Sequence, residues 1–255
     1  TTPESVPVNA RCAPMTSLLS RETSEPVCAR VKKAIKVAIS CGGFGEGCAR
    51  LGAMYQQGRG VKRDSARAPA LLQQGCDLGS MLGCAGLGAL HRSGAGVPRD
   101  LARASTLFDR ACEGGEPAGC AQLGGLLAAG EGVAQDVDSA AVLHRRACDA
   151  GVAIGCVGLG RLHVAGTGVP QSDSLAHHLF EGACYGGGEP SGCFELGLTY
   201  ETGRGTMQRY GRAFSLYESA CDDGHGEACY RQAKLYERGA GTSRDADAAK
   251  SLAKR

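Results

Sequence analysis

The sequence predicts an all-α protein: a right-handed α/α solenoid of about six two-helix repeats with one disulfide per repeat. Three observations lead to this prediction. Cysteine pairs recur along the chain at intervals of 35 to 37 residues, 40 residues are Gly, and only 5% are aromatic, with no Trp. A fixed period in this range is typical of solenoids, in which each unit buries its apolar face only against its neighbours. A core built on large aromatic side chains is not expected.

Twelve of the 14 Cys form six close pairs. Neither the C-x-x-C motif of redox enzymes nor the C-x-x-C knuckles of structural zinc sites are present, which leaves zinc binding and redox-active thiols as minor alternatives. An even cysteine count with one repeated wide spacing favours disulfides, each worth about 2.5 kcal/mol in the chain-entropy account. The pairs expected are Cys41–Cys48, Cys76–Cys84, Cys112–Cys120, Cys148–Cys156, Cys184–Cys193 and Cys221–Cys229, with Cys12–Cys28 as the remaining pair.

The cysteine period also sets the domain boundaries. Residues 1–44 are expected to form an N-terminal capping segment with a helix over 26–41, and residues 226–255 a sixth repeat with the C-terminal cap. The five repeats between them are expected at 45–80, 81–116, 117–152, 153–189 and 190–225.

Each repeat is expected to contain two helices, as the third repeat illustrates. Gly130 should end the first helix, since it can adopt a positive φ at the cap, and the Asp136 side chain should cap the second helix, which ends at Gly151. The buried stripes should consist of Cys120, Leu123, Gly124 and Leu127 on the first helix and of Ala140, Leu143, His144, Ala147 and Cys148 on the second. Each disulfide then joins the end of one repeat to the start of the next.

The repeated pattern C-x-x-L-G-x-L/Y-x-x-x-G-x-G-V-x-x-D-x-x-x-A-x-x-L-F-x-x-A-C resembles the Sel-1-like repeat, a relative of the tetratricopeptide repeat. With Cys at both ends of the pattern, the chain is similar to the Helicobacter cysteine-rich proteins. The resemblance covers about residues 41–255 in six units. It departs from the pattern in the sixth unit, at Gln232 and Ala233, and in the fifth, where Thr206 and Gln208 replace the usual Val and capping region.

The resemblance to tetratricopeptide repeats implies that the first helix of each repeat lines a concave groove. The N-terminal half of this groove should carry small residues, whereas the C-terminal half carries aromatic and charged ones. An aromatic residue beside a basic one is typical of a peptide-binding hot spot, although these side chains could instead form an ordinary solvated face. The candidate binding residues are Val157, Arg161, Phe194, Leu198, Glu201, Tyr230, Lys234 and Glu237.

The histidines do not indicate a metal site. His91 and His163 occupy a column otherwise filled by Tyr and Leu, and His144 shares a column with Phe108 and Phe180, so all three are expected in the core. No H-E-x-x-H motif is present, and we expect neither a metal nor a cofactor.

The resemblance also implies one enzymatic alternative, because some Helicobacter cysteine-rich proteins are associated with β-lactam binding and weak hydrolysis. A serine β-lactamase needs an S-x-x-K arrangement. The single example, Ser251 with Lys254, lies at the end of the last expected helix, and neither K-T-G nor S-D-N accompanies it. We therefore predict no catalytic residue.

The predicted function is a non-catalytic scaffold of the cell envelope or secreted fraction, which binds a protein or peptide in the concave groove. Structural disulfides favour a periplasmic or secreted location, although the given chain has no signal sequence. The net charge of +2 excludes a nucleic-acid footprint, and no apolar run is long enough to span a membrane. We expect a monomer. The alternatives are a weak β-lactam-binding or β-lactam-hydrolysing enzyme and a mitochondrial intermembrane-space assembly factor.

Overall fold

The computed structural model describes residues 44–252, and every regular element in that range is helical. The predicted 26–41 helix and the Cys12–Cys28 pair lie outside the described residues, as does Cys41. The helices are α2 (Gly45–Gln57), α3 (Arg67–Asp77), α4 (Met81–Ser93), α5 (Leu101–Glu113), α6 (Pro117–Ala129), α7 (Val137–Asp149), α8 (Ala153–Ala165), α9 (Asp173–Glu181) followed by the π-helical turn η1 (Gly182–Gly186), α10 (Pro190–Thr202), α11 (Tyr210–Asp222), α12 (Gly226–Arg238) and α13 (Ala246–Leu252). The all-α solenoid prediction is confirmed.

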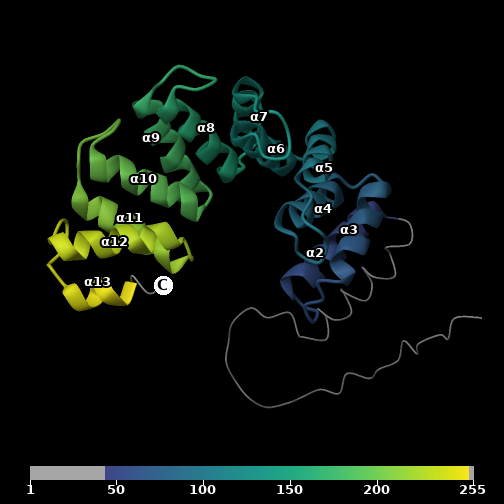
Figure 1. Ribbon diagram of the computed structural model, residues 1–255, viewed down its shortest axis with the longest axis horizontal. Coiled ribbons are helices and arrows are strands. Elements are labelled where there is room, and N and C mark those ends of the chain that lie inside the picture. The colour runs from purple at the N-terminus through teal and green to yellow at the C-terminus, as the bar shows by residue number, and fades with distance from the viewer. Residues whose placement is uncertain (1–43, 253–255) are drawn as a thin grey trace, which may run out of the picture.

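The helices stack into an arch that runs from α2 at one end to α13 at the other (Figure 1). Each helix packs against the next one in the chain, and α2 also contacts α4, α6 contacts α8, and α8 contacts α10. We call α2, α4, α6, α8, α10 and α12 the inner helices, because they face the inside of the arch. The odd-numbered helices α3 to α11 are the outer helices.

The helix ends follow the expected turn chemistry. In the third repeat, α6 ends at Gly130 with φ of 69°, and the Asp136 carboxylate accepts a hydrogen bond from the backbone N–H of Ser139 at the start of α7. Gly132 also has a positive φ, and a Cβ there would lie 2.3 Å from the Cβ of Leu101 in the preceding repeat. These caps satisfy terminal backbone groups and let successive repeats approach closely.

The core consists of one large side chain per outer helix set against a glycine of the inner helix in the same repeat. Phe108 of α5 and Phe180 of α9 are fully buried, and a Cβ on Gly88 or Gly160 would lie 2.7 or 2.5 Å from the respective ring. The glycine of the Leu-Gly pair therefore makes room for this side chain. The buried stripe of α6 differs from the prediction in one position, because Leu126 is buried while Leu127 is only half-buried.

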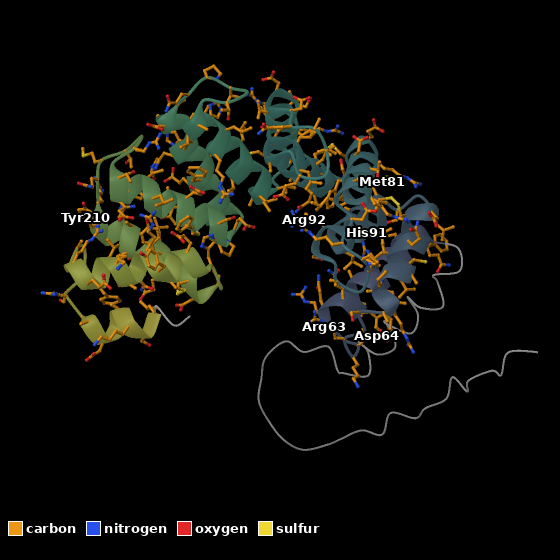
Figure 2. The ribbon with its side chains drawn as sticks, in the orientation of Figure 1. Arg63, Asp64, Met81, His91, Arg92 and Tyr210 are labelled. Carbon is orange, nitrogen blue, oxygen red and sulfur yellow. A yellow bond between two sulfur atoms is a disulfide. The ribbon has the colours of Figure 1, made fainter. Side chains whose placement is uncertain are left out.

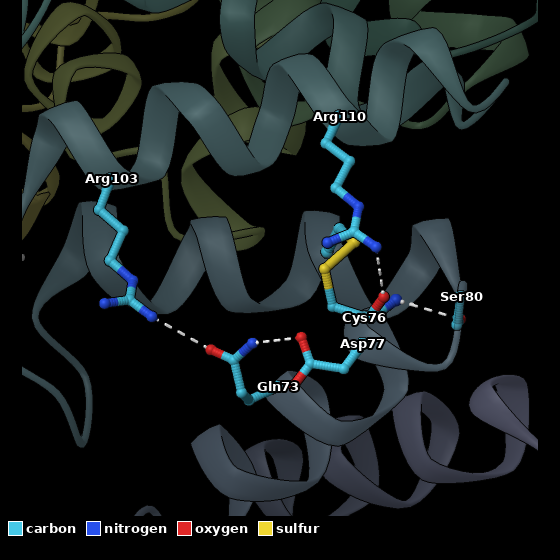
Figure 3. The surroundings of a disulfide bond; sticks show 8 residues. Gln73, Cys76, Asp77, Ser80, Arg103 and Arg110 are labelled. Atoms are coloured by element: carbon cyan, nitrogen blue, oxygen red, sulfur yellow. Dashed lines mark hydrogen bonds between the residues drawn. A yellow bond between two sulfur atoms is a disulfide. The ribbon is translucent and has the colours of Figure 1, made fainter.

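Five disulfides join the end of an outer helix to the start of the next inner helix. They are Cys76–Cys84, Cys112–Cys120, Cys148–Cys156, Cys184–Cys193 and Cys221–Cys229, with Cα–Cα distances of 4.5 to 4.7 Å. Cys48 is also disulfide-bonded. Figure 3 shows the first of the five, where the Arg110 guanidinium of the next repeat donates a hydrogen bond to the carbonyl of Cys76 at 3.0 Å. The disulfides thus fasten the joints between repeats.

The repeats depart from one another in two places. The Cys184–Cys193 pair spans nine positions where the other four span eight, and the additional residue is accommodated by the π-helical turn η1. In the fifth repeat, Arg209 precedes α11 and its side chain provides no capping hydrogen bond, as the altered sequence there predicts.

Across the described part of the chain, no helix is long and apolar enough to cross a membrane.

Candidate binding site on the inner face

A pocket of about 400 Å³ opens on the inner face at the middle of the arch. We call it the central pocket. Its residues come mainly from α6 and α8, with one contribution each from α4, α7 and α10, so it extends across four successive repeats. The lining consists of Arg92, Ala121, Gln122, Gly125, Ala128, Ala129, His144, Ile154, Val157, Gly158, Arg161, Leu162 and Ser191.

Two glycines within helices line the central pocket. Gly125 of α6 and Gly158 of α8 both lie in helix interiors, where Gly costs about 1 kcal/mol relative to Ala. At Gly158 a Cβ would lie 2.3 Å from the His144 ring, so packing explains this glycine. At Gly125 a Cβ would meet nothing within 4 Å, and the residue is exposed. Packing within the described chain therefore gives no reason for Gly125.

His144 of α7 forms the floor of the central pocket, between Gly124 and Gly158. Its side chain is only 4% exposed, and within the described residues its Nδ1 atom has no hydrogen-bond partner. Burial, together with the positive charge of Arg161, lowers the pKa of His144 to about 4. The imidazole is therefore neutral near pH 7, with one donor and one acceptor nitrogen.

This burial predicts a pH-dependent stability. The pKa of His144 is 6.5 in an unfolded chain and about 4 in the fold, so the unfolded chain binds the proton more tightly. The free energy of unfolding should therefore fall between pH 6.5 and pH 4, by up to about 3 kcal/mol from this residue. Urea unfolding at several pH values measures the slope. His144→Phe is the control, because Phe occupies the equivalent position in α5 and α9, and an equal slope in both chains would contradict the assignment.

Two arginines lie at the rim of the central pocket. The Arg92 guanidinium of α4 donates a hydrogen bond to the side-chain carbonyl of Gln122 on α6, and Figure 2 shows Arg92 on the inside of the arch. The Arg161 Nε donates to the Glu195 carboxylate of α10 at 2.6 Å. Among the described residues, Arg92 has no carboxylate within 4 Å, whereas Arg161 is neutralised by Glu195. The pocket lining itself contains no Asp or Glu.

The predicted groove residues do not all gather in this pocket. Val157, which is buried, and Arg161 line it. Phe194 is only 7% exposed, because its ring stacks on His225 with centroids 4.5 Å apart, and it packs near Tyr217. Its role in the fold is therefore that of a core residue.

The remaining candidates lie toward the C-terminal end of the inner face. Tyr230 is half-exposed, and the Lys234 Nζ atom lies 5.5 Å from the centre of its ring while forming a 2.8 Å ion pair with Glu237. Leu198 and Glu201 are half-buried. The Tyr217 hydroxyl donates a hydrogen bond to the Glu201 carboxylate at 2.6 Å. The pKa of Tyr217 is raised mainly by its burial and also by this hydrogen bond.

Sequence reasoning missed another column of inner-face residues, one position after the column that contains Val157, Phe194 and Tyr230. It contains Arg50, Gly86, Gln122, Gly158, Glu195 and Arg231. The available signal was the pair of glycines within predicted helices, Gly86 and Gly158, in a column that later carries Glu195 and Arg231, because Gly in a helix interior needs a reason. The contribution of His144 to the pocket floor depends on the adjacent Gly158 and carries no separate sequence signal.

Two of the histidines have structural roles. His91 and His163 are buried as expected, and their Nδ1 atoms lie 3.3 and 2.9 Å from the carbonyl oxygens of Pro98 and Pro170. Ser251 is exposed on α13, and Lys254 lies outside the described residues.

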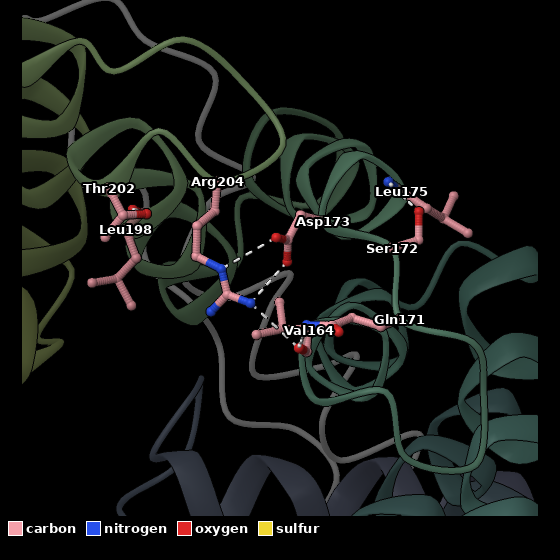
Figure 4. A network of polar contacts seen from close by, with 8 residues as sticks. All are labelled: Val164, Gln171, Ser172, Asp173, Leu175, Leu198, Thr202 and Arg204. Atoms are coloured by element: carbon pink, nitrogen blue, oxygen red, sulfur yellow. Dashed lines mark hydrogen bonds and ion pairs between the residues drawn. The ribbon is translucent and has the colours of Figure 1, made fainter.

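A separate polar network joins the fourth repeat to the fifth (Figure 4). The Arg204 guanidinium, in the loop after α10, donates to the Asp173 carboxylate at 2.9 Å and to the carbonyl of Val164 at 3.4 Å. These contacts fix the loop against the preceding repeat.

Comparison with known proteins identifies the repeat. The Sel1 repeat model matches residues 45–80, 82–116, 117–152, 153–188, 190–225 and 226–255. No curated protein sequence matches the chain. A Sel1 repeat protein from Oxalobacter formigenes is 23% identical with a TM-score of 0.71, and the match covers 87% of this chain and 96% of that one.

Two further solved structures are similar. The antigen c5321 of uropathogenic Escherichia coli, described as a protective antigen with an SLR fold, is 24% identical with a TM-score of 0.64 over 87% of this chain. This chain covers 47% of its length. Helicobacter pylori cysteine-rich protein B is 27% identical over 49% of this chain and 92% of its own, with a TM-score of 0.40.

Proposed function

The chain belongs to the Sel1 repeat family, and from this premise we propose that it is a non-catalytic scaffold that binds an extended protein or peptide segment along its inner face. Repeats of this family commonly mediate protein interactions, and solenoids use their concave surfaces for binding. The observation that carries the proposal is the central pocket, because it crosses four repeats and so matches the shape of an extended chain.

The disulfides support a location for this scaffold. Five of them lie in the described chain, and disulfides at this density form and persist in oxidising compartments. We place the protein in the periplasm or the secreted fraction. The rigid joints suit a binding scaffold, because a surface fixed before binding loses less conformational entropy when the ligand arrives.

Site-specific photo-cross-linking tests the proposed surface. Replacement of Ala129 by p-benzoylphenylalanine places the cross-linker at an exposed position of the central pocket. The matched control is Val142 of the outer helix α7, which is 67% exposed. In cells that express the protein from its own gene, irradiation should give a discrete adduct from position 129 and none from position 142. Equal adducts from both positions, or adducts from 142 alone, would refute binding at the inner face.

A further inference from the structure

We infer that the central pocket recognises a carboxylate group of an acidic peptide segment, through Arg92 at its rim and His144 at its floor, with the ligand backbone passing over Gly125. This inference rests on the proposed function and names the ligand class of the same site. It draws on three separate observations: an unbalanced charge, an unpartnered buried nitrogen and a glycine without a packing role.

The first observation is the charge of the pocket. No carboxylate belongs to the lining, and the lining residue Arg161 is already paired with Glu195 at 2.6 Å. Arg92 bonds a neutral amide, so its charge stays uncompensated within the described residues. One uncompensated cation matches a single negative charge, and the guanidinium presents paired N–H donors that fit a carboxylate. A phosphate dianion would be left half-neutralised in this site.

The second observation is the buried imidazole. His144 is more than nine-tenths buried, lines the pocket floor, and has an Nδ1 atom without a partner in the described chain. Buried polar atoms are nearly always hydrogen-bonded in native proteins, to protein, to ordered water or to a ligand, and His144 Nδ1 has no protein partner among the described residues. Outer helices of the neighbouring repeats carry Phe108 and Phe180 at this position, which shows that the fold does not require a polar group there. A neutral imidazole can give an N–H to a carboxylate oxygen without adding a second charge.

The third observation is Gly125. Gly within a helix lowers the stability of the fold by about 1 kcal/mol relative to Ala, yet a Cβ at this position would meet no atom within 4 Å. A glycine facing a binding surface allows another backbone to approach closely. The neighbouring lining residues Ala121 and Ala128 also have short side chains, which leave space above this part of α6. The lining of the central pocket therefore combines a place for close backbone approach with two groups that can recognise an anion, Arg92 and His144.

Affinity selection on the intact, disulfide-bonded chain tests the inference. A random library of synthetic dodecapeptides with free C-termini is incubated with the immobilised protein, and retained peptides are identified by mass spectrometry. Selected peptides should be enriched in Asp and Glu. Resynthesis with each acid changed to its amide, and separately with an amidated C-terminus, shows whether a side chain or the chain terminus supplies the carboxylate.

Three variants locate the contact. Arg92→Gln and His144→Phe should each weaken binding of the selected peptide at least tenfold, as expected for loss of a charge-assisted hydrogen bond. Arg145→Gln is the matched control, since Arg145 is an exposed arginine of α7 beside His144 in sequence, and it should change affinity less than twofold. Circular dichroism of each variant establishes that it is folded before its affinity is interpreted.

The outcomes separate this inference from the proposed function. Selected peptides that are not acidic, or that bind Arg92→Gln as tightly as the parent, would overturn carboxylate recognition. If a bulky Gly125→Trp change still abolishes their binding, the inner face remains the binding surface. Recovery of no peptide, or only of peptides indifferent to Gly125→Trp, would overturn both.

Discussion

Complete reduction of the disulfides is expected to unfold the chain. Each described disulfide closes a short loop, with its cysteines eight or nine positions apart, and the chain-entropy account values it at about 2.5 kcal/mol. The five together therefore contribute about 12 kcal/mol, which matches the whole stability of a typical domain. The buried apolar side chains between the joints are mostly the small or medium-sized Ala and Leu, so the core compensates only in part.

Far-ultraviolet circular dichroism at about 37 °C measures the loss of helical structure after reduction directly. The helical signal should collapse after reduction and alkylation under mild denaturant and stay lost after the denaturant is removed. The untreated chain, taken through the same denaturant cycle, should refold. A reduced and alkylated chain that recovers its full helical signal would show that the repeats hold together without their disulfides.

Truncation of one buried aromatic side chain is expected to have the next largest effect. Phe108 is fully buried between Leu123, Leu126 and the backbone of Gly88. Phe108→Ala should lower the free energy of unfolding by about 3–5 kcal/mol, because it removes apolar contacts and leaves a cavity that the stapled joints prevent from closing.

Chemical denaturation of Phe108→Ala and of Val142→Ala separates this effect from a general cost of substitution. Val142 lies on α7 and is mostly exposed, so its truncation should change the free energy of unfolding by less than about 0.5 kcal/mol. Comparable losses in the two variants would contradict the account of the core, in which one large side chain fills each repeat.

Much of the fold could be predicted from the sequence, because it is encoded in local, repeated signals. The positive φ of Gly130 and the cap at Asp136 depend only on residues near them in the chain, and the cysteine spacing fixes the joints. The absence of a capping side chain before α11 was likewise visible in the altered fifth repeat.

The site was less predictable, because it depends on contacts between repeats. Phe194 is an aromatic residue of the kind that is common in peptide-binding hot spots, yet its stacking on His225 of the next repeat buries it. His144 appeared to be an ordinary core substitute, and only its position beneath Gly158 shows that it reaches the pocket. The pairing of Arg161 with Glu195 likewise joins α8 to α10 and has no signature within either helix.

The measurement that tests the central claim most directly is the combined stability and affinity of Gly125→Ala. The claim is that the inner face is shaped for a ligand at some cost to the free protein. The variant should therefore be more stable by about 0.5–1 kcal/mol, since Ala favours the helix and its Cβ meets no atom of the described chain. It should also bind the affinity-selected dodecapeptide several-fold more weakly, because the methyl group occupies the path of the ligand backbone. Increased stability with unchanged affinity would contradict the claim that Gly125 is kept open for a ligand.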